Sequence, residues 1–468
     1  MIRLPEPETI SIRRDDENRD VQLARSCLQR LIEICVALAA LTRAFRSRGV
    51  AIEKPQDNAS RRSIVLSDKS RPIIQSTLPA VGPHIQEIAK CSYGLLFAAH
   101  PELMDGPFSR SHQADATQQQ ALAGSVAAFA TALVNSPDRL PENLLSRIAH
   151  KHTSLGIQPE PYQIVHDHLM SAIAEVLGDA VTPGVAAAWD EVYWLMAYTL
   201  THVERGLSGA RGVSPQTVWR QWEVEKKIQE TDDVVTFVVK RIEDHMVKPS
   251  LAGQYISVQV PLPDGTRQSR QYSLSRADKG ESRRFSVKRV HGAAGKPDGE
   301  ASTLLHTSIG VGDVLNLSVP FGPLVLDDYS GRPMVFISGG IGITPMAGML
   351  SRLATARSPF PIMLLHADHN EHAFALRNQI RDDIVALRLA SIYVWYEQGA
   401  DSQLPVQGVF AGRMDLSHVR LPDNAVYHMC GPIPFMHGIR SALIALGIPP
   451  RDIQYEMFGP DLWQADYE

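Results

Sequence analysis

The spacing of apolar residues changes twice along this 468-residue chain, and these changes constrain its fold more than any single motif. Between about Val65 and Leu207 apolar residues recur every three or four positions, as in "TQQQALAGSVAAFATALVN", which predicts helices. After "GARGVSPQTVW" short β-branched or aromatic runs such as "VVTFVVKRIE" and "GQYISVQVPL" are separated by turn residues, which is typical of an antiparallel barrel. From about Arg332 strand-like and helix-like segments alternate, which predicts a parallel, doubly wound sheet.

The length of the chain suggests about three domains at roughly 150 residues each. The predicted parts are an N-terminal extension over 1–64, an all-α domain over 65–210, an antiparallel β-barrel over 216–328 and an α/β doubly wound domain over 329–468. The extension is predicted to form one amphipathic helix and a polar linker, and we expect it to pack on its own protein, to self-associate or to contact a partner. A helix on a membrane surface and an upstream segment wrongly assigned to the gene stay open as alternatives.

Composition excludes several kinds of partner and site. A formal net charge of -5 gives no general attraction to nucleic acid, so no nucleic-acid partner is expected. Four cysteines without a Cys-x-x-Cys pair support neither a disulfide framework nor a cysteine zinc site, and a reducing cytoplasm is the simplest compartment. The run "ICVALAAL" is well short of the roughly 20 residues of a spanning helix, so no transmembrane segment is expected.

A glycine cluster, "SGGIGITPM", lies between a predicted strand and a predicted helix of the last domain. Gly339, Gly340 and Gly342 allow the backbone to approach a ligand closely, and the helix N-terminus offers unpaired N–H groups to a pyrophosphate. Thr344 suits the cap of this helix, and Pro345 suits its first turn. A tight turn needs the same glycines, but the strand–loop–helix context favours a phosphate-binding site.

The predicted strand "RQYSLS" places Arg270 and Tyr272 on one face, because side chains alternate along a strand. An arginine fork beside a flat aromatic ring suits a ligand that carries a diphosphate and a planar ring system. Taken alone, an arginine and a tyrosine on a strand are more often plain surface residues.

Six segments occur in a fixed order, "GQY", "RQYS", "GEAS", "GGIGITP", "CGP" and "YEMFGP", and over about residues 216–468 the chain resembles the ferredoxin-reductase-like flavin and nicotinamide module. The resemblance implies that Arg270 faces the FAD pyrophosphate, Tyr272 stacks on the isoalloxazine and Ser273 lies near N5. It places Ser302 at the FAD phosphates and Phe458 over the other flavin face. The glycine loop and "CGP" would hold NAD(P)H. The residues assigned to these two cofactors are Tyr255, Arg270, Gln271, Tyr272, Ser273, Ser302, Gly339, Gly340, Gly342, Thr344, Pro345, Cys430, Gly431, Pro432 and Phe458.

The choice between NADH and NADPH depends on a segment of the last domain. After its second strand, "HADHNEHAF" has no obvious arginine for a 2′-phosphate, which favours NADH. Arg377 is close enough in sequence to keep NADPH open.

Four of the 17 histidines lie in "IAHKHTSLGIQPEPYQIVHDHLM", namely His150, His152, His166 and His168. Residues two apart on a helix point about 200° apart, so neither pair can hold one ion together. A zinc site of the i, i+4 kind is therefore disfavoured. Haem iron, in contrast, needs a single histidine from the protein. From composition alone, each histidine is more often a surface or core residue.

The same segment resembles the globin half of a flavohaemoglobin, through its Lys-His-Thr-Ser core followed by Gln-Pro-Glu and Tyr. The resemblance implies haem b with His152 as the iron ligand. It also implies that Tyr162 and Glu204 form hydrogen bonds around that histidine, which would make it a stronger donor to iron and favour O2 activation over storage.

On the distal side the resemblance assigns three further positions. Tyr93, in "YGLLFAAHPEL", would donate a hydrogen bond to bound O2. Gln118 would be the distal glutamine, although its neighbours Gln119 and Gln120 leave the register open. Phe108, in "DGPFSR", would pack against the haem, in the core, or both.

The two resemblances together imply an NAD(P)H-dependent nitric oxide dioxygenase. Electrons would pass from NAD(P)H to FAD and then to haem, and O2 would oxidise NO to nitrate, which is a detoxification reaction of nitrosative stress. O2 and NO are then the small-molecule substrates. Two alternatives stay open: a haem-dependent reductase of O2 or hydroperoxides, and a haem-based gas sensor or O2-binding protein.

Overall fold

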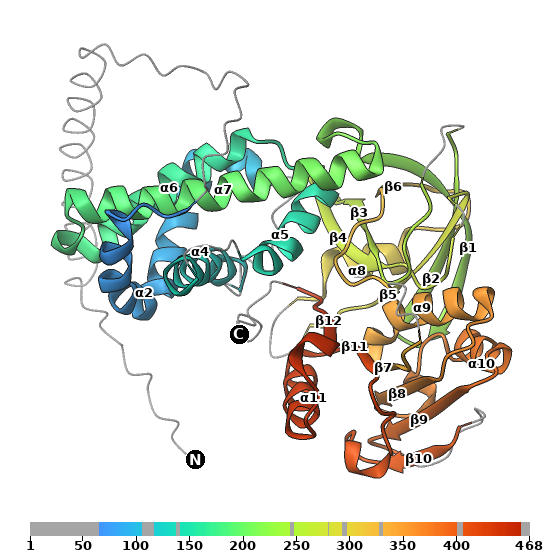
Figure 1. Ribbon diagram of the computed structural model, residues 1–468. Helices are drawn as coiled ribbons and strands as arrows, with labels where there is room; N and C mark the ends of the chain where they lie inside the picture. The colour runs from blue at the N-terminus through green and yellow to red at the C-terminus, as the bar shows by residue number, and fades with distance from the viewer. Residues whose placement is uncertain are drawn as a thin grey trace, which may run out of the picture. The chain divides into compact units, whose positions relative to one another are not determined.

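A computed structural model gives the architecture of most of the chain (Figure 1). The residues that it describes are 65–104, 117–136, 141–243, 248–278, 280–292, 297–326, 331–399 and 406–459. The predicted extension over 1–64 and Phe108 lie outside the described residues. Among the helices in the described ranges, none has the length and apolar character needed to cross a membrane.

The first described region is helical, as its periodicity predicts. Its α-helices are α2 (Ser70–Ala99), α4 (Thr117–Asn135), α5 (Glu142–Leu155), α6 (Glu160–Leu177) and α7 (Pro183–Arg211). Helix α2 packs on α4, α6 and α7, and α5 packs on α7, around a core that contains the fully buried Phe129 and Trp189. Helix α7 begins where the Thr182 hydroxyl accepts a hydrogen bond from the backbone N–H of Val185, and it ends at Gly212 in the left-handed conformation.

The second region is an antiparallel barrel. Its strands are β1 (Trp219–Thr231), β2 (Val234–Arg241), β3 (Tyr255–Pro261), β4 (Arg267–Ser273), β5 (Ser282–Lys288) and β6 (Val314–Ser318). They pair in the order β4-β3-β6-β1-β2-β5. A bridge between Leu274 and Phe285 joins the two ends of this order, so the sheet closes on itself. Helix α8 (Glu300–Thr307) packs against β3, β4 and β5.

The third region is a parallel sheet with helices on both faces. Its strands are β7 (Met334–Gly339), β8 (Ile362–Asp368), β9 (Ala390–Tyr396), β10 (Gly408–Ala411), β11 (Val426–Cys430) and β12 (Ile453–Glu456). Its helices are α9 (Ile343–Ala356), α10 (Arg377–Ala386) and α11 (Ile433–Ala445). The strand order is β10-β9-β8-β7-β11-β12, so the winding reverses between β7 and β11. Ligands of doubly wound folds bind at the carboxyl ends of the strands at such a reversal.

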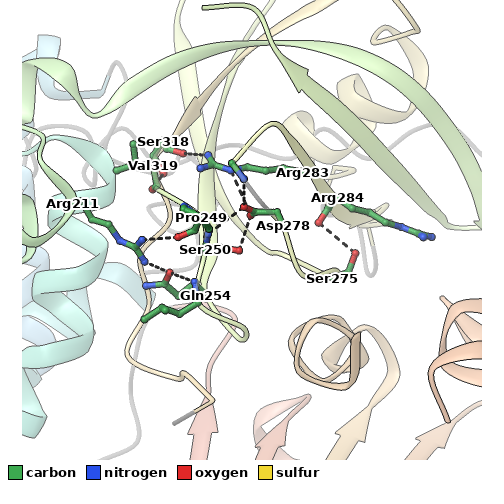
Figure 2. Close-up of polar contacts among 12 residues, drawn as sticks. Arg211, Pro249, Ser250, Gln254, Ser275, Asp278, Arg283, Arg284, Ser318 and Val319 are labelled. Carbon is green, nitrogen blue, oxygen red and sulfur yellow. Dashed lines mark hydrogen bonds and ion pairs between the residues drawn. The ribbon is translucent and has the colours of Figure 1, made fainter. Parts of the chain in front are cut away.

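The end of α7 is tied to the barrel by polar contacts (Figure 2). The Arg211 guanidinium donates to the Pro249 carbonyl at 2.9 Å and to the side-chain oxygen of Gln254. Deeper in the barrel, Asp278 and Arg283 form an ion pair at 3.8 Å, with side chains 2% and 0% exposed. Burial lowers the pKa of Arg283 to about 10, although Asp278 acts in the opposite direction.

We expect Asp278→Ala to lower the free energy of unfolding by about 3–5 kcal/mol, because it leaves the buried Arg283 charge uncompensated. Urea unfolding followed by circular dichroism measures the change. The matched control is Asp382→Ala, which removes the carboxylate of an exposed pair with Arg381 and should cost at most about 1 kcal/mol. Equal losses in the two variants would show that the buried pair has no special role.

Candidate functional site

A cavity of about 1250 Å³ is lined by residues of the helical region, the barrel, the start of α9 and the end of β12. Its helical wall is mostly apolar, with side chains such as Leu122, Val126, Ile148, Met196 and Leu200. The predicted site residues that line it are Tyr93, His152, Tyr162, Tyr255, Arg270, Gln271, Tyr272, Ser273, Ser302, Thr344 and Phe458. Residues that are far apart in the sequence therefore line one cavity.

Three predicted residues meet beside the helical wall. His152 lies near the end of α5, Tyr162 near the start of α6 and Glu204 on α7. The Nδ1 atom of His152 lies 2.9 Å from the Tyr162 hydroxyl and 2.9 Å from Oε1 of Glu204. The Tyr162 hydroxyl donates to the same Glu204 oxygen at 2.6 Å. The structure thus forms the hydrogen bonds that the resemblance implies.

The donors and acceptors of this group indicate which nitrogen of His152 donates a hydrogen bond. Burial, followed by the Glu204 carboxylate, raises the pKa of Tyr162 far above its usual range, so the phenol stays protonated and donates a hydrogen bond to Glu204. The remaining donor must be Nδ1–H of His152, because a carboxylate only accepts. An imidazole that carries its proton on Nδ1 can offer the Nε2 lone pair to a metal. His152 therefore fits the role of the one histidine ligand that the protein would supply to haem iron.

The other three histidines of the segment have separate partners. His150 accepts a hydrogen bond at Nδ1 from the backbone N–H of Gly322 at 2.9 Å, and burial lowers its pKa to about 4. His166 contacts Asp190 at 2.7 Å through Nε2, and His168 donates from Nδ1 to the Ile164 carbonyl at 2.7 Å. Within the described ranges, no three His, Cys, Asp or Glu side chains converge as metal ligands. The histidines of each pair therefore contact different groups, as their spacing along a helix predicts.

Tyr93 supplies a polar group to the mostly apolar helical wall of the cavity. Its side chain on α2 is 4% exposed, and its ring lies 5.6 Å from that of Phe97. Burial raises the pKa of Tyr93 above its usual range, so the hydroxyl stays protonated and can donate. Gln118 lies in α4, but its side chain is outside the described residues, as is Phe108.

On the barrel side, Arg270 and Tyr272 lie on one face of β4 as alternation predicts, and both line the cavity. The Tyr272 ring stacks on Phe285 with centroids 5.7 Å apart. The Ser273 hydroxyl is buried and has no hydrogen-bond partner in the described part of the chain. Buried hydroxyls are normally paired, so this group suits a ligand acceptor. Arginine, flat ring and unpaired hydroxyl together fit a flavin nucleotide.

The start of α8 adds an anion site to this wall. Gly299, Ala301 and Ser302 line the cavity, and the first N–H groups of a helix have no intrahelical partner. The Ser302 hydroxyl accepts from the backbone N–H of Val290 at 3.1 Å and donates to the Gly299 carbonyl at 3.0 Å. Its side chain therefore holds the turn, and we expect the backbone N–H groups at the start of α8 to contact the flavin phosphates.

Arg147, Lys151 and Glu456 also line the cavity, and sequence reasoning did not assign them roles. Arg147 donates to the carbonyl of Tyr455 at 3.0 Å and lies over its ring. Burial, and then Arg270, lowers the pKa of Lys151. The sequence held one indication of Arg147 and Lys151: they are four positions apart, so they share a face of α5, and Lys151 immediately precedes His152.

The glycine loop and the "CGP" segment meet at the winding reversal. Gly342 lies against the end of β11, where an added Cβ would be 2.2 Å from the Cys430 carbonyl oxygen. An added Cβ at Gly431 would be 3.1 Å from the backbone nitrogen of Gly339. Gly340 has a φ of 51°, which favours glycine. The last residue of the "CGP" segment, Pro432, immediately precedes α11. A dinucleotide pyrophosphate is expected at this edge of the sheet, where the carboxyl ends of β7 and β11 meet.

The prediction that Thr344 caps α9 is wrong. A 3₁₀ turn over Gly340–Gly342 runs directly into α9, which begins at Ile343. Thr344 is therefore inside the first turn, and its hydroxyl donates to the Ile341 carbonyl at 3.0 Å. Pro345 lies in the first turn, as predicted.

Family models match the three regions separately. Residues 91–200 match the globin model, residues 221–325 the oxidoreductase FAD-binding domain and residues 336–441 the oxidoreductase NAD-binding domain. The chain is therefore a globin joined to an NAD(P)H-dependent flavin oxidoreductase, and the predicted fold is confirmed.

Several relatives match most of this chain over nearly their whole length. A flavohaemoprotein of Rhizobium meliloti is 38% identical over 406 residues, which is 85% of this chain and 100% of that protein. One of Chromobacterium violaceum is 38% identical over 84% of this chain and 98% of that protein. The crystal structure of a flavohaemoglobin from Malassezia yamatoensis, with bound FAD and haem, is 37% identical, covers 84% of this chain and 100% of that chain, and has a TM-score of 0.76. The chain belongs to the flavohaemoprotein family. Its cofactors are haem, FAD and NAD(P)H, and electrons pass from NAD(P)H through FAD to haem.

Proposed function

We propose that this protein is a nitric oxide dioxygenase, which uses NAD(P)H and O2 to oxidise NO to nitrate. The observation that carries the proposal is the hydrogen-bonded group of His152, Tyr162 and Glu204 beside a cavity that Tyr93 also lines. A histidine that donates strongly to iron suits O2 activation rather than reversible storage.

Haem supplies O2 binding and one-electron chemistry when bound, and the protein supplies position and polarity. Glu204 and Tyr162 hold the Nδ1 proton of His152, so that its Nε2 lone pair stays available. Tyr93 supplies a hydrogen-bond donor to the mostly apolar helical wall of the cavity. Gln118 is the second donor that we propose from the family resemblance, and its side chain lies outside the described residues.

On the reductase side, Arg270 and the start of α8 would hold the flavin diphosphate, while Tyr272 and Ser273 would contact its ring. Phe458 is 45% exposed, and we propose that it covers the flavin until nicotinamide displaces it. The glycine loop beside Cys430 would hold the NAD(P)H pyrophosphate.

One comparison separates this function from hydroperoxide reduction. Protein loaded with haem and FAD is supplied with NADH, and turnover of NO in air is compared with turnover of an alkyl hydroperoxide at the same electron supply. The dioxygenase proposal requires faster NO turnover with nitrate as the product. Faster hydroperoxide turnover would identify a reductase instead.

Tyr93→Phe should release O2 about 10- to 100-fold faster and slow NO turnover, because it removes a buried hydrogen-bond donor from the O2 site. Stopped-flow displacement of O2 by CO measures the dissociation rate. Tyr198→Phe, which removes the hydroxyl of an exposed tyrosine in the same region, is the control and should leave the rate unchanged. An unchanged rate in Tyr93→Phe would contradict the distal role of this residue.

A further inference from the structure

Two faces of helix α5 have different surroundings, the cavity and the barrel. His152 lines the cavity, whereas Ser154, two positions later and about 200° around the helix, points to the barrel. The hydroxyl oxygens of Ser154 and Ser257 on β3 lie 2.8 Å apart, and both side chains are fully buried. Two buried hydroxyls thus join the helix that carries the proposed iron ligand to the barrel.

This contact belongs to a longer chain of hydrogen bonds, in which each hydroxyl accepts from one neighbour and donates to the next. The Ser154 hydroxyl donates its proton to the Lys151 carbonyl at 2.8 Å, so it must accept from Ser257. The Ser257 hydroxyl, in turn, accepts from the side-chain amide of Gln271 at 3.0 Å. The chain therefore runs from Gln271 through Ser257 and Ser154 to the Lys151 carbonyl, and we call it the serine relay.

Both ends of the serine relay lie beside a cofactor site. Gln271 pairs directly with Ser257 across β3 and β4, and its two neighbours along β4 are Arg270 and Tyr272. At the other end, the Lys151 carbonyl immediately precedes His152. The relay is thus a direct polar connection between the proposed flavin strand and the proposed haem ligand.

We infer that Ser154 and Ser257 are positioning residues for electron transfer from flavin to haem. All the hydrogen bonds of the serine relay can form together only when α5 and β3 lie in one alignment. Because a buried hydroxyl without a partner is costly in free energy, the relay favours that alignment over others. That alignment fixes the separation of the two cofactors. The inference uses only the NAD(P)H–FAD–haem electron path of the family, and it does not depend on NO chemistry.

The test is anaerobic stopped-flow reduction by NADH of wild type, Ser257→Ala, Ser154→Ala and the double variant, each loaded with FAD and haem. Flavin and haem absorbance are followed separately, and flavin fluorescence lifetime reports how strongly haem quenches the flavin. We expect flavin reduction and cofactor content to stay within about twofold of wild type, and haem reduction to slow about tenfold or more, because a displacement of about 1 Å can cost up to about 100-fold in rate. The fluorescence lifetime should lengthen.

The two single variants and the double variant should be similarly slow, because the relay fails as a unit. Thr236→Val is the control, since Thr236 shares a buried hydroxyl contact of 2.7 Å with Ser286 inside the same barrel. It should leave haem reduction unchanged. The proposal is overturned if haem reduction is unchanged in Ser257→Ala, if it slows equally in the control, or if flavin reduction slows in parallel. Should Ser257→Ala not fold, Ser154→Ala decides alone, because alanine is favourable in a helix.

Discussion

His152→Ala should remove most of the haem and lower NO consumption by more than about 100-fold, since loss of a group that only orients a metal ligand already costs about 10–100-fold. The structure gives the reason: His152 is the histidine of its segment whose Nδ1 is held by Glu204 and whose Nε2 is left for iron. Haem content from the absorbance spectrum and NO consumption at an electrode are the two measurements.

His168→Ala is the matched control for this variant, because Nδ1 of His168 donates to the backbone carbonyl of Ile164. It should retain haem and NO consumption. NADH oxidation with ferricyanide as acceptor should be normal in both variants, because the region that matches the FAD-binding domain is the barrel, over residues 221–325. Full haem content and NO consumption in His152→Ala would require a different iron ligand.

Gly342→Ala should block electron entry while leaving haem and FAD in place. An added Cβ would lie 2.2 Å from the Cys430 carbonyl oxygen and 2.8 Å from the Gly431 nitrogen, both of which are backbone atoms. The glycine loop must then move away from β11, at the edge proposed for the pyrophosphate. We expect kcat/KM for NADH to fall by about 100-fold or more, as for other displacements of a bound reactant by about 1 Å.

Stopped-flow reduction of the flavin by NADH measures this effect, and dithionite should still reduce both flavin and haem. Gly438→Ala is the control in the same domain, because an added Cβ at this glycine of α11 meets nothing within 4 Å. It should behave as wild type. Normal reduction by NADH in Gly342→Ala would show that the nucleotide does not depend on this close approach.

The fold was predictable where the apolar pattern is strong, and less so elsewhere. Strand β7 is buried along its whole length and reads as a continuous apolar run. Strand β1 was not predicted, because it is long, rich in charged residues and mostly exposed or half-buried. Strand β6 was not predicted either, since it is short and alternates with polar residues. Thr344 was misplaced because glycine backbone geometry, rather than capping preference, sets the start of α9.

The candidate site was predictable only in part from the chain itself. Alternation along one strand suffices to place Arg270 and Tyr272 on one face. Glu204, in contrast, is 52 residues from His152, and only the family resemblance linked them. The contact of Ser154 with Ser257 spans 103 residues and joins two regions of different fold, so no local pattern predicts it.

The most direct test of the central claim is the balance of NO consumption by protein loaded with haem and FAD, in air, with NADH. Each NADH gives two electrons and each conversion of NO and O2 to nitrate takes one. The account therefore predicts that two NO and two O2 disappear for each NADH oxidised, with nitrate as the product. NADH oxidation that continues while NO persists would contradict it, and would make the globin half a sensor or the site of another oxidant's reduction.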